Sequence, residues 1–119
     1  MIKQMPEAKS GTDRRRFERV EIAPEAKVLV FDVKGRKAGV LRQLARGGFM
    51  MVPEKDYTKD TKIYNFTILE PREEIKVTVN ARARSAGKDY AGFEFVDLDP
   101  AAAVEIGHII GAYYEHKKD

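Results

Sequence analysis

Within residues 75–85, apolar and polar side chains alternate from Ile75 to Arg84. The apolar face carries Ile75, Val77, Val79, Ala81 and Ala83, and the polar face carries Lys76, Thr78, Asn80, Arg82 and Arg84. A period of two over this length predicts an antiparallel strand with one face in a core and the other in water. The stretch therefore favours a mainly β fold.

Five further segments are rich in β-branched and aromatic residues and are bounded by turn signals. They cover residues 27–33, 38–44, 49–52, 63–69 and 90–98. Turn signals at intervals of about 8–12 residues are typical of a small barrel or sandwich. We expect a six- or seven-stranded antiparallel β-barrel, in which the Gly47-Gly48 pair forms a turn or bulge with positive φ.

The end of the chain has a helical period instead. Asp99 is a good N-cap residue and Pro100 a good first helical residue. The apolar residues that follow recur on one helical face: Ala102, Ile106, Ile109, Ile110 and Tyr113. We predict a C-terminal helix over residues 99–116, packed on the barrel. With a flexible tail at residues 1–13, a single domain is expected over residues 14–116.

The residues that catalysis and metal binding require are scarce. The chain has no cysteine, and its two serines, Ser10 and Ser85, lie in the predicted tail and at a strand end. His108 and His116 are eight residues apart, whereas metal-binding histidine pairs on a helix usually sit four apart. We expect neither an enzyme nor a metal or cofactor site.

The charge is unevenly distributed along the chain. Residues 1–52 carry 12 basic and 6 acidic side chains, against 10 and 13 in the remainder. A basic first half is typical of a protein with an anionic partner, although a solvated basic surface would look the same. The first residues lack the apolar stretch of a signal peptide, and residues 101–114 are too short to span a bilayer, so a cytoplasmic location is expected.

The most unusual feature is an arginine-rich segment before the first strand. Arg14, Arg15, Arg16 and Arg19 fall within six residues. Their planar, bidentate donors suit phosphate oxygens and guanine edges. An exposed basic segment that binds nothing is the alternative.

Two motifs taken together resemble the PilZ family of bacterial cyclic diguanylate receptors. The first is Arg15-x-x-x-Arg19, which matches the family's R-x-x-x-R. The second is Gln43-Leu44-Ala45-Arg46-Gly47-Gly48, which stands where the family has [D/N]-x-S-x-x-G. The resemblance covers residues 14–112 and implies a small β-barrel with a closing helix.

The resemblance also implies which residues bind the ligand. They are Arg14, Arg15, Arg16, Arg19, Gln43, Ala45, Arg46 and Gly48. Gln43 replaces Asp or Asn, and Ala45 lacks the serine hydroxyl, whose hydrogen bond is worth about 0.5–1.5 kcal/mol. The arginines contribute about 1.5–3 kcal/mol each, so we expect binding that is weakened and not abolished. Arg14 is at a position that accompanies binding of a stacked ligand pair in the family.

Two functions follow from this pattern. The first is a cyclic diguanylate receptor whose arginine-rich segment becomes ordered over the barrel when the ligand binds. The second is a divergent adaptor that binds no nucleotide and acts in motility or pilus assemblies. Nucleic acid is not an expected partner, because the aromatic residues fit core faces and do not form a stacking surface. A downstream protein partner is expected, but its identity leaves no trace in the sequence.

Overall fold

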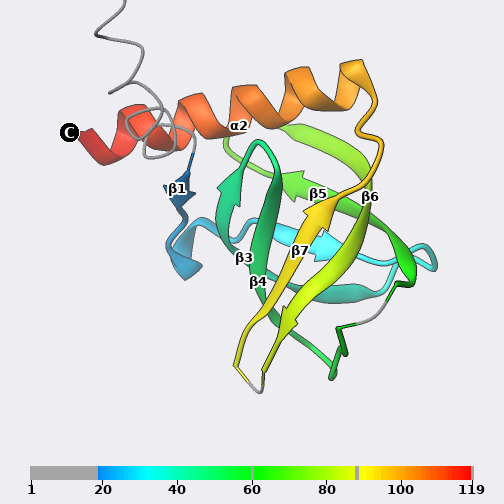
Figure 1. The fold of residues 1–119 in the computed structure, drawn as a ribbon. Coiled ribbons are helices and arrows are strands. Elements are labelled where there is room, and N and C mark those ends of the chain that lie inside the picture. The colour runs from blue at the N-terminus through cyan, green and yellow to red at the C-terminus, as the bar shows by residue number, and fades with distance from the viewer. Residues whose placement is uncertain (1–18, 60, 88, 119) are drawn as a thin grey trace, which may run out of the picture.

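The computed structural model describes residues 19–59, 61–87 and 89–118, with side chains as far as Tyr114. The predicted tail and the arginines at positions 14–16 lie outside these residues. The described elements are β1 (Val20–Glu21), η1 (Pro24–Ala26), β2 (Leu29–Phe31), β3 (Lys37–Ala45), β4 (Gly48–Pro53), β5 (Ile63–Glu70), β6 (Ile75–Ala86), β7 (Ala91–Phe95) and α2 (Pro100–Lys118). Figure 1 shows their arrangement.

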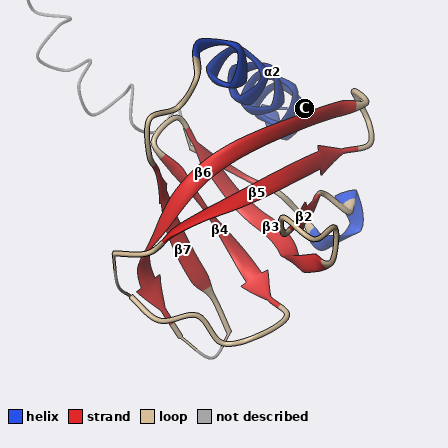
Figure 2. Cartoon of the chain, turned by 90° about the vertical axis from the view of Figure 1, so that its right-hand side faces the viewer, coloured by secondary structure: helices blue, strands red, loops and turns tan. Residues whose placement is uncertain are grey.

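Six strands form a closed antiparallel barrel. The strands follow the order β3-β2-β5-β6-β7-β4, and a β4–β3 pairing closes the ring (Figure 2). The short strand β1 is a seventh strand that pairs antiparallel with the end of β3. The predicted mainly β barrel with a C-terminal helix is therefore confirmed.

The core is formed by the apolar face predicted for residues 75–85. Val77, Val79, Ala81 and Ala83 are buried, and Ile75 is half-buried at the strand end. Their neighbours form an aromatic cluster of Phe49, Tyr57, Tyr64, Phe66 and Phe93, in which most ring pairs meet edge to face. Aromatic packing of this geometry adds to the burial energy of the barrel interior.

Helix α2 lies across one end of the barrel (Figure 1). The five residues predicted to face the barrel are all buried: Ala102, Ile106, Ile109, Ile110 and Tyr113. The helix begins at Pro100, and the Asp99 carbonyl accepts a hydrogen bond from the Ala103 amide at 2.9 Å. Its start agrees with the prediction, and its end lies two residues beyond the predicted position 116.

Two strands are shorter than the sequence suggested. β2 begins at Leu29, because Lys27 adopts a left-handed conformation at the end of η1, with φ 56°. β7 ends at Phe95, and Asp97 has φ 50° in the bend that follows. Backbone with positive φ cannot continue a strand, so both elements are confined to their central residues.

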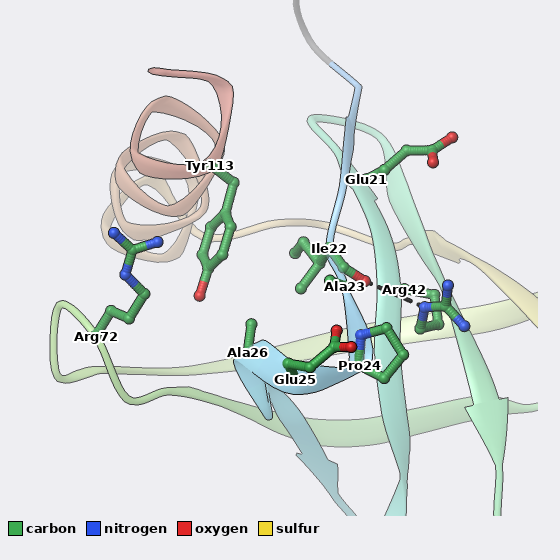
Figure 3. A pocket seen from close by; sticks show the side chains of 9 residues that line it. All are labelled: Glu21, Ile22, Ala23, Pro24, Glu25, Ala26, Arg42, Arg72 and Tyr113. Carbon is green, nitrogen blue, oxygen red and sulfur yellow. Dashed lines mark hydrogen bonds between the residues drawn. The ribbon is translucent and has the colours of Figure 1, made fainter. Parts of the chain in front are cut away.

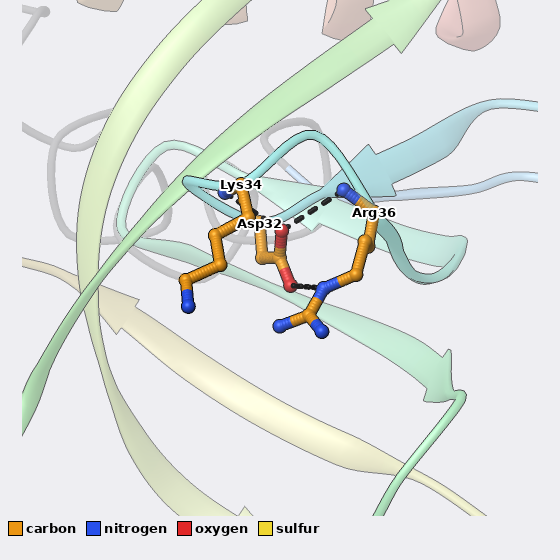
Figure 4. Close-up of polar contacts among 3 residues, drawn as sticks. All are labelled: Asp32, Lys34 and Arg36. Carbon is orange, nitrogen blue, oxygen red and sulfur yellow. Dashed lines mark hydrogen bonds and ion pairs between the residues drawn. The ribbon is translucent and has the colours of Figure 1, made fainter.

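The turn between β2 and β3 is closed by a carboxylate (Figure 4). Asp32 accepts hydrogen bonds from the backbone amides of Lys34 and Arg36, each at 2.9 Å, and pairs with Arg36 Nε at 3.4 Å. These bonds, the Arg36 amide first, lower the pKa of Asp32. Gly35 supplies the positive φ of 79° that the turn requires.

Candidate functional site

Strand β1 directly follows the arginine-rich segment and pairs with the part of β3 that carries the second motif. Val20 pairs with Leu44 and Glu21 with Gln43. Val20 and Leu44 are buried, so the alternation of the strands directs Glu21 and Gln43 to the outer face of the barrel. There Gln43 Nε2 donates a hydrogen bond to Glu21 Oε2 at 3.4 Å.

The same register places the last arginine of the first motif. Arg19 is exposed and immediately precedes β1. Arg19 is joined to Val20, the partner of Leu44, so it lies next to the end of β3 that carries Ala45, and Ala45 in turn pairs with Gly48 on β4. Four predicted site residues, Arg19, Gln43, Ala45 and Gly48, are thus brought together where β1, β3 and β4 meet.

Gly48 is required by the approach of β7. A Cβ atom at this position would lie 2.1 Å from the carbonyl oxygen of Phe93, closer than any real contact. The expected positive φ at Gly47 and Gly48 is wrong, because neither residue adopts it. The glycine at position 48 is needed for space and not for backbone conformation, since β4 and β7 are paired there.

Arg46, another predicted ligand residue, lies against the C-terminal helix. Its guanidinium nitrogen is 3.5 Å from the position that a Cβ atom of residue 107 would occupy. A Cβ atom at position 107 would make only an ordinary van der Waals contact with it, so an alanine would also fit there. The β3–β4 turn and α2 are in contact through this arginine.

A charged cluster that the motifs did not indicate adjoins Gly48. Glu94 on β7 pairs with Gly48 on one side and with Arg82 on the other. Its carboxylate accepts a charged hydrogen bond from Arg84 at 2.7 Å and lies 3.9 Å from Arg82 Nε. The alternation of residues 75–85 placed both arginines on the outer face, but the sequence carries no signal that β7 pairs with β4.

An open pocket of about 670 Å³ lies between β1, η1 and the C-terminal half of α2 (Figure 3). Its lining residues are Glu21, Ile22, Ala23, Pro24, Glu25, Ala26, Arg42, Arg72 and Tyr113. Arg42 Nε donates a hydrogen bond to the Ile22 carbonyl at 3.1 Å and so ties the segment between β1 and η1 to β3. The charges at its rim are mixed, and the pocket has no uniform preference for anions.

A buried hydrogen bond anchors α2 beside this pocket. Glu70, only 1% exposed, accepts hydrogen bonds from the Tyr113 hydroxyl at 2.5 Å and from the backbone amides of Arg72 and Glu73. Burial and the neighbouring carboxylate raise the pKa of Tyr113, which keeps its hydroxyl protonated. This contact holds the end of α2 to the β5–β6 turn.

The described part of the chain contains neither a metal-binding group of side chains nor a helix that could span a membrane. Within it, no group of three or more histidine, aspartate or glutamate side chains is arranged to hold a metal ion. His108 Nδ1 lies 3.7 Å from Glu105 Oε1 on the same helix. No helix in the described residues is both long and apolar enough to cross a bilayer.

Comparison with known proteins now adds to this geometry. The sequence model of the PilZ domain family matches residues 13–112. Comparison with curated protein sequences gives no significant match.

Several solved structures are similar to this chain. The PilZ domain of CeSA from a cellulose-synthesizing bacterium matches with a TM-score of 0.57 and 16% identity, over 79% of this chain and 95% of that one. An uncharacterized Legionella protein matches with a TM-score of 0.60 and 7% identity, over 85% and 98%. The PlzA protein of Borreliella burgdorferi, solved with c-di-GMP, matches with a TM-score of 0.49 and 14% identity, over 87% and 44%.

The first two similarities concern the fold alone, because their sequence identities are low. The family assignment comes from the sequence model, which spans most of the chain and includes both motifs. The barrel and its closing helix agree with that assignment. The chain belongs to the PilZ domain family.

Proposed function

We propose that this protein is a receptor for cyclic diguanylate. The observation that carries the proposal is the convergence of Arg19, Gln43, Ala45 and Gly48 at the junction of β1, β3 and β4. These residues come from two motifs that are more than twenty positions apart in the sequence. The proposed role is binding, with no catalytic step.

Charge recognition supports this ligand. Cyclic diguanylate carries two phosphates and two guanine bases, and guanidinium groups form bidentate hydrogen bonds with both. Arg19 is exposed at the edge of the site. Arg15 is four residues earlier in the segment that leads into β1. Each charge-assisted contact is expected to contribute about 1.5–3 kcal/mol.

Other features of the site reduce the expected affinity. Ala45 offers no hydroxyl, which costs about 0.5–1.5 kcal/mol relative to serine. Glu21 places a carboxylate near the same junction, and its negative charge opposes an anionic ligand. The carboxylate of Glu94 is instead balanced by Arg82 and Arg84. The losses are smaller than the combined contribution of the arginines, so binding is retained.

We also propose that ligand binding orders the Arg14–Arg19 segment over the barrel. The support is positional, because this segment is joined directly to β1, and β1 is fixed to β3 beside Gln43. Phosphates held between Arg15, Arg19 and the β3–β4 turn would tie the segment to the barrel. The ordered segment would present a new surface to a downstream protein.

The adaptor function is the second candidate. The Glu21 carboxylate and the missing hydroxyl at position 45 favour it, because both weaken an anion site. An adaptor of this kind would use the barrel surface to contact a protein of a motility or pilus assembly. Direct ligand titration separates the two candidates.

Calorimetric titration of the full chain with cyclic diguanylate tests the receptor proposal. Arg19→Ala should weaken binding about tenfold to a hundredfold, because it removes a charge-assisted contact. The matched control is Arg36→Ala, which removes the same charge at the opposite end of β3 and should leave the affinity within about twofold. Absence of binding by the unmodified protein would support the adaptor function.

A further inference from the structure

The hydrogen bond between Glu21 and Gln43 is set by strand pairing. The two residues are direct partners in the β1–β3 register, and Gln43 Nε2 lies 3.4 Å from Glu21 Oε2. The buried Val20 fixes this register, because a slip of β1 by one residue would turn its side chain outward while Leu44 stayed in the barrel. The two side chains are therefore held next to each other before any ligand arrives.

A carboxylate beside a glutamine determines which end of the amide faces outward. An ionised carboxylate can only accept hydrogen bonds, so it must face the NH₂ group of Gln43 and not its carbonyl oxygen. The Gln43 oxygen then remains as the end of the amide available to a ligand. One of the two Nε2 hydrogens is then committed to Glu21, and the ligand meets the Gln43 amide mainly through its oxygen.

We propose that Glu21 is a positioning residue through which Gln43 selects guanine over adenine; this inference rests on the proposed binding of a cyclic dinucleotide at this site. On its pairing edge guanine presents adjacent N–H donors, and an acceptor matches them. Adenine presents a donor beside an acceptor, which an unrestrained glutamine amide matches with both of its ends. Fixing the amide by Glu21 favours the first base and disfavours the second.

A purely electrostatic role for Glu21 has different consequences. A carboxylate near the phosphates would weaken cyclic diguanylate and cyclic diadenylate equally, because the two ligands carry the same charge. Removing such a charge would strengthen both and leave their ratio unchanged. The ratio of the two dissociation constants is therefore the informative quantity.

The experiment measures the dissociation constants of cyclic diguanylate and cyclic diadenylate by calorimetry for the full chain and for Glu21→Ala. The variant should lower the preference for the guanine ligand by about tenfold, the value of one net hydrogen bond. The matched control is Glu25→Ala, which removes an exposed carboxylate from η1 and should leave the preference unchanged. Circular dichroism of each variant checks that the barrel is intact.

A second variant tests the same idea by rescue. In the Glu21→Ala background, Gln43→Glu again presents only acceptor atoms, so the preference for the guanine ligand should return. An unchanged ratio in Glu21→Ala, or no recovery in the double variant, would overturn the positioning role while leaving cyclic diguanylate binding in place. Absence of binding of either ligand by the unmodified protein would instead overturn the proposed function, and this inference with it.

Discussion

The two ends of strand β3 use charged side chains in opposite ways. At its first end, the Asp32 carboxylate bonds to two backbone amides and to Arg36 within one short turn (Figure 4). At its last end, Gln43 and Ala45 lie beside Glu21 and Arg19, which come from a different part of the sequence. The first arrangement satisfies its own charges locally and stabilises a turn.

The second arrangement leaves Arg19 exposed beside the β3–β4 turn, and this turn is held in place by close contacts. Gly48 is held against the Phe93 carbonyl, and the Arg46 side chain lies on α2. A rigid turn next to an exposed guanidinium is suited to ligand binding, since little ordering is required of the barrel. The difference shows why two polar ends of one strand need not have the same role.

The largest expected effect is a loss of stability at the C-terminal end of β3, where the chain turns into β4. Gly48→Ala should lower the free energy of unfolding by about 1–3 kcal/mol, because the new Cβ would overlap the Phe93 carbonyl oxygen. The measurement is urea denaturation followed by circular dichroism.

Gly47→Ala is the matched control for this change. A Cβ atom there would meet no other atom within 4 Å, so the free energy of unfolding should change by less than about 0.5 kcal/mol. Equal effects of the two substitutions would contradict the close β4–β7 approach.

An intermediate effect is expected from restoring the family's second motif. Gln43→Asn together with Ala45→Ser should tighten cyclic diguanylate binding by up to about tenfold, because the serine regains a hydrogen bond. Calorimetric titration measures this change. Weaker binding by the double variant would show that this site binds its ligand differently from the family pattern. The bond between Glu21 and Gln43 would then contribute more to the affinity than the lost hydroxyl.

The smallest effect is expected at the first end of β3. The pKa of Asp32 is lowered in the folded protein, so its contribution to stability is present above the unfolded pKa of about 3.9 and is lost as the pH falls through the folded value. Asp32→Asn should therefore slightly flatten the loss of stability below pH 4, without changing ligand affinity. Unfolding followed at several acidic pH values measures this slope, and a slope identical to that of the unmodified protein would contradict the role of the turn.

The parts of the fold that could be predicted have a strong local period. Alternation identified the buried face of β6, and helical spacing identified all five buried residues of α2 from Ala102 to Tyr113. The family resemblance, based on Arg15, Arg19 and the glycine at position 48, agrees with the sequence model match. Local patterns carried this information because each face is defined within one element.

The remaining features depend on contacts between distant segments. The contact of Glu21 with Gln43 joins residues 22 positions apart, and the contact of Glu70 with Tyr113 joins residues 43 positions apart. No local period encodes such pairs, since they depend on register and on the packing of α2. The assignment of Arg46 to the ligand could likewise not anticipate its position against Gly107.

We propose that the ligand binds at the C-terminal end of β3, beside Gln43 and Ala45, and not at the N-terminal end beside Asp32. Titration of the ¹⁵N-labelled full chain with cyclic diguanylate, followed by backbone amide chemical shifts, tests it most directly. We predict large shifts for residues 19–22 and 43–48, and unchanged shifts for the Asp32–Arg36 turn. Shifts concentrated at Asp32–Arg36, or no shifts at saturating ligand concentrations, would contradict the claim.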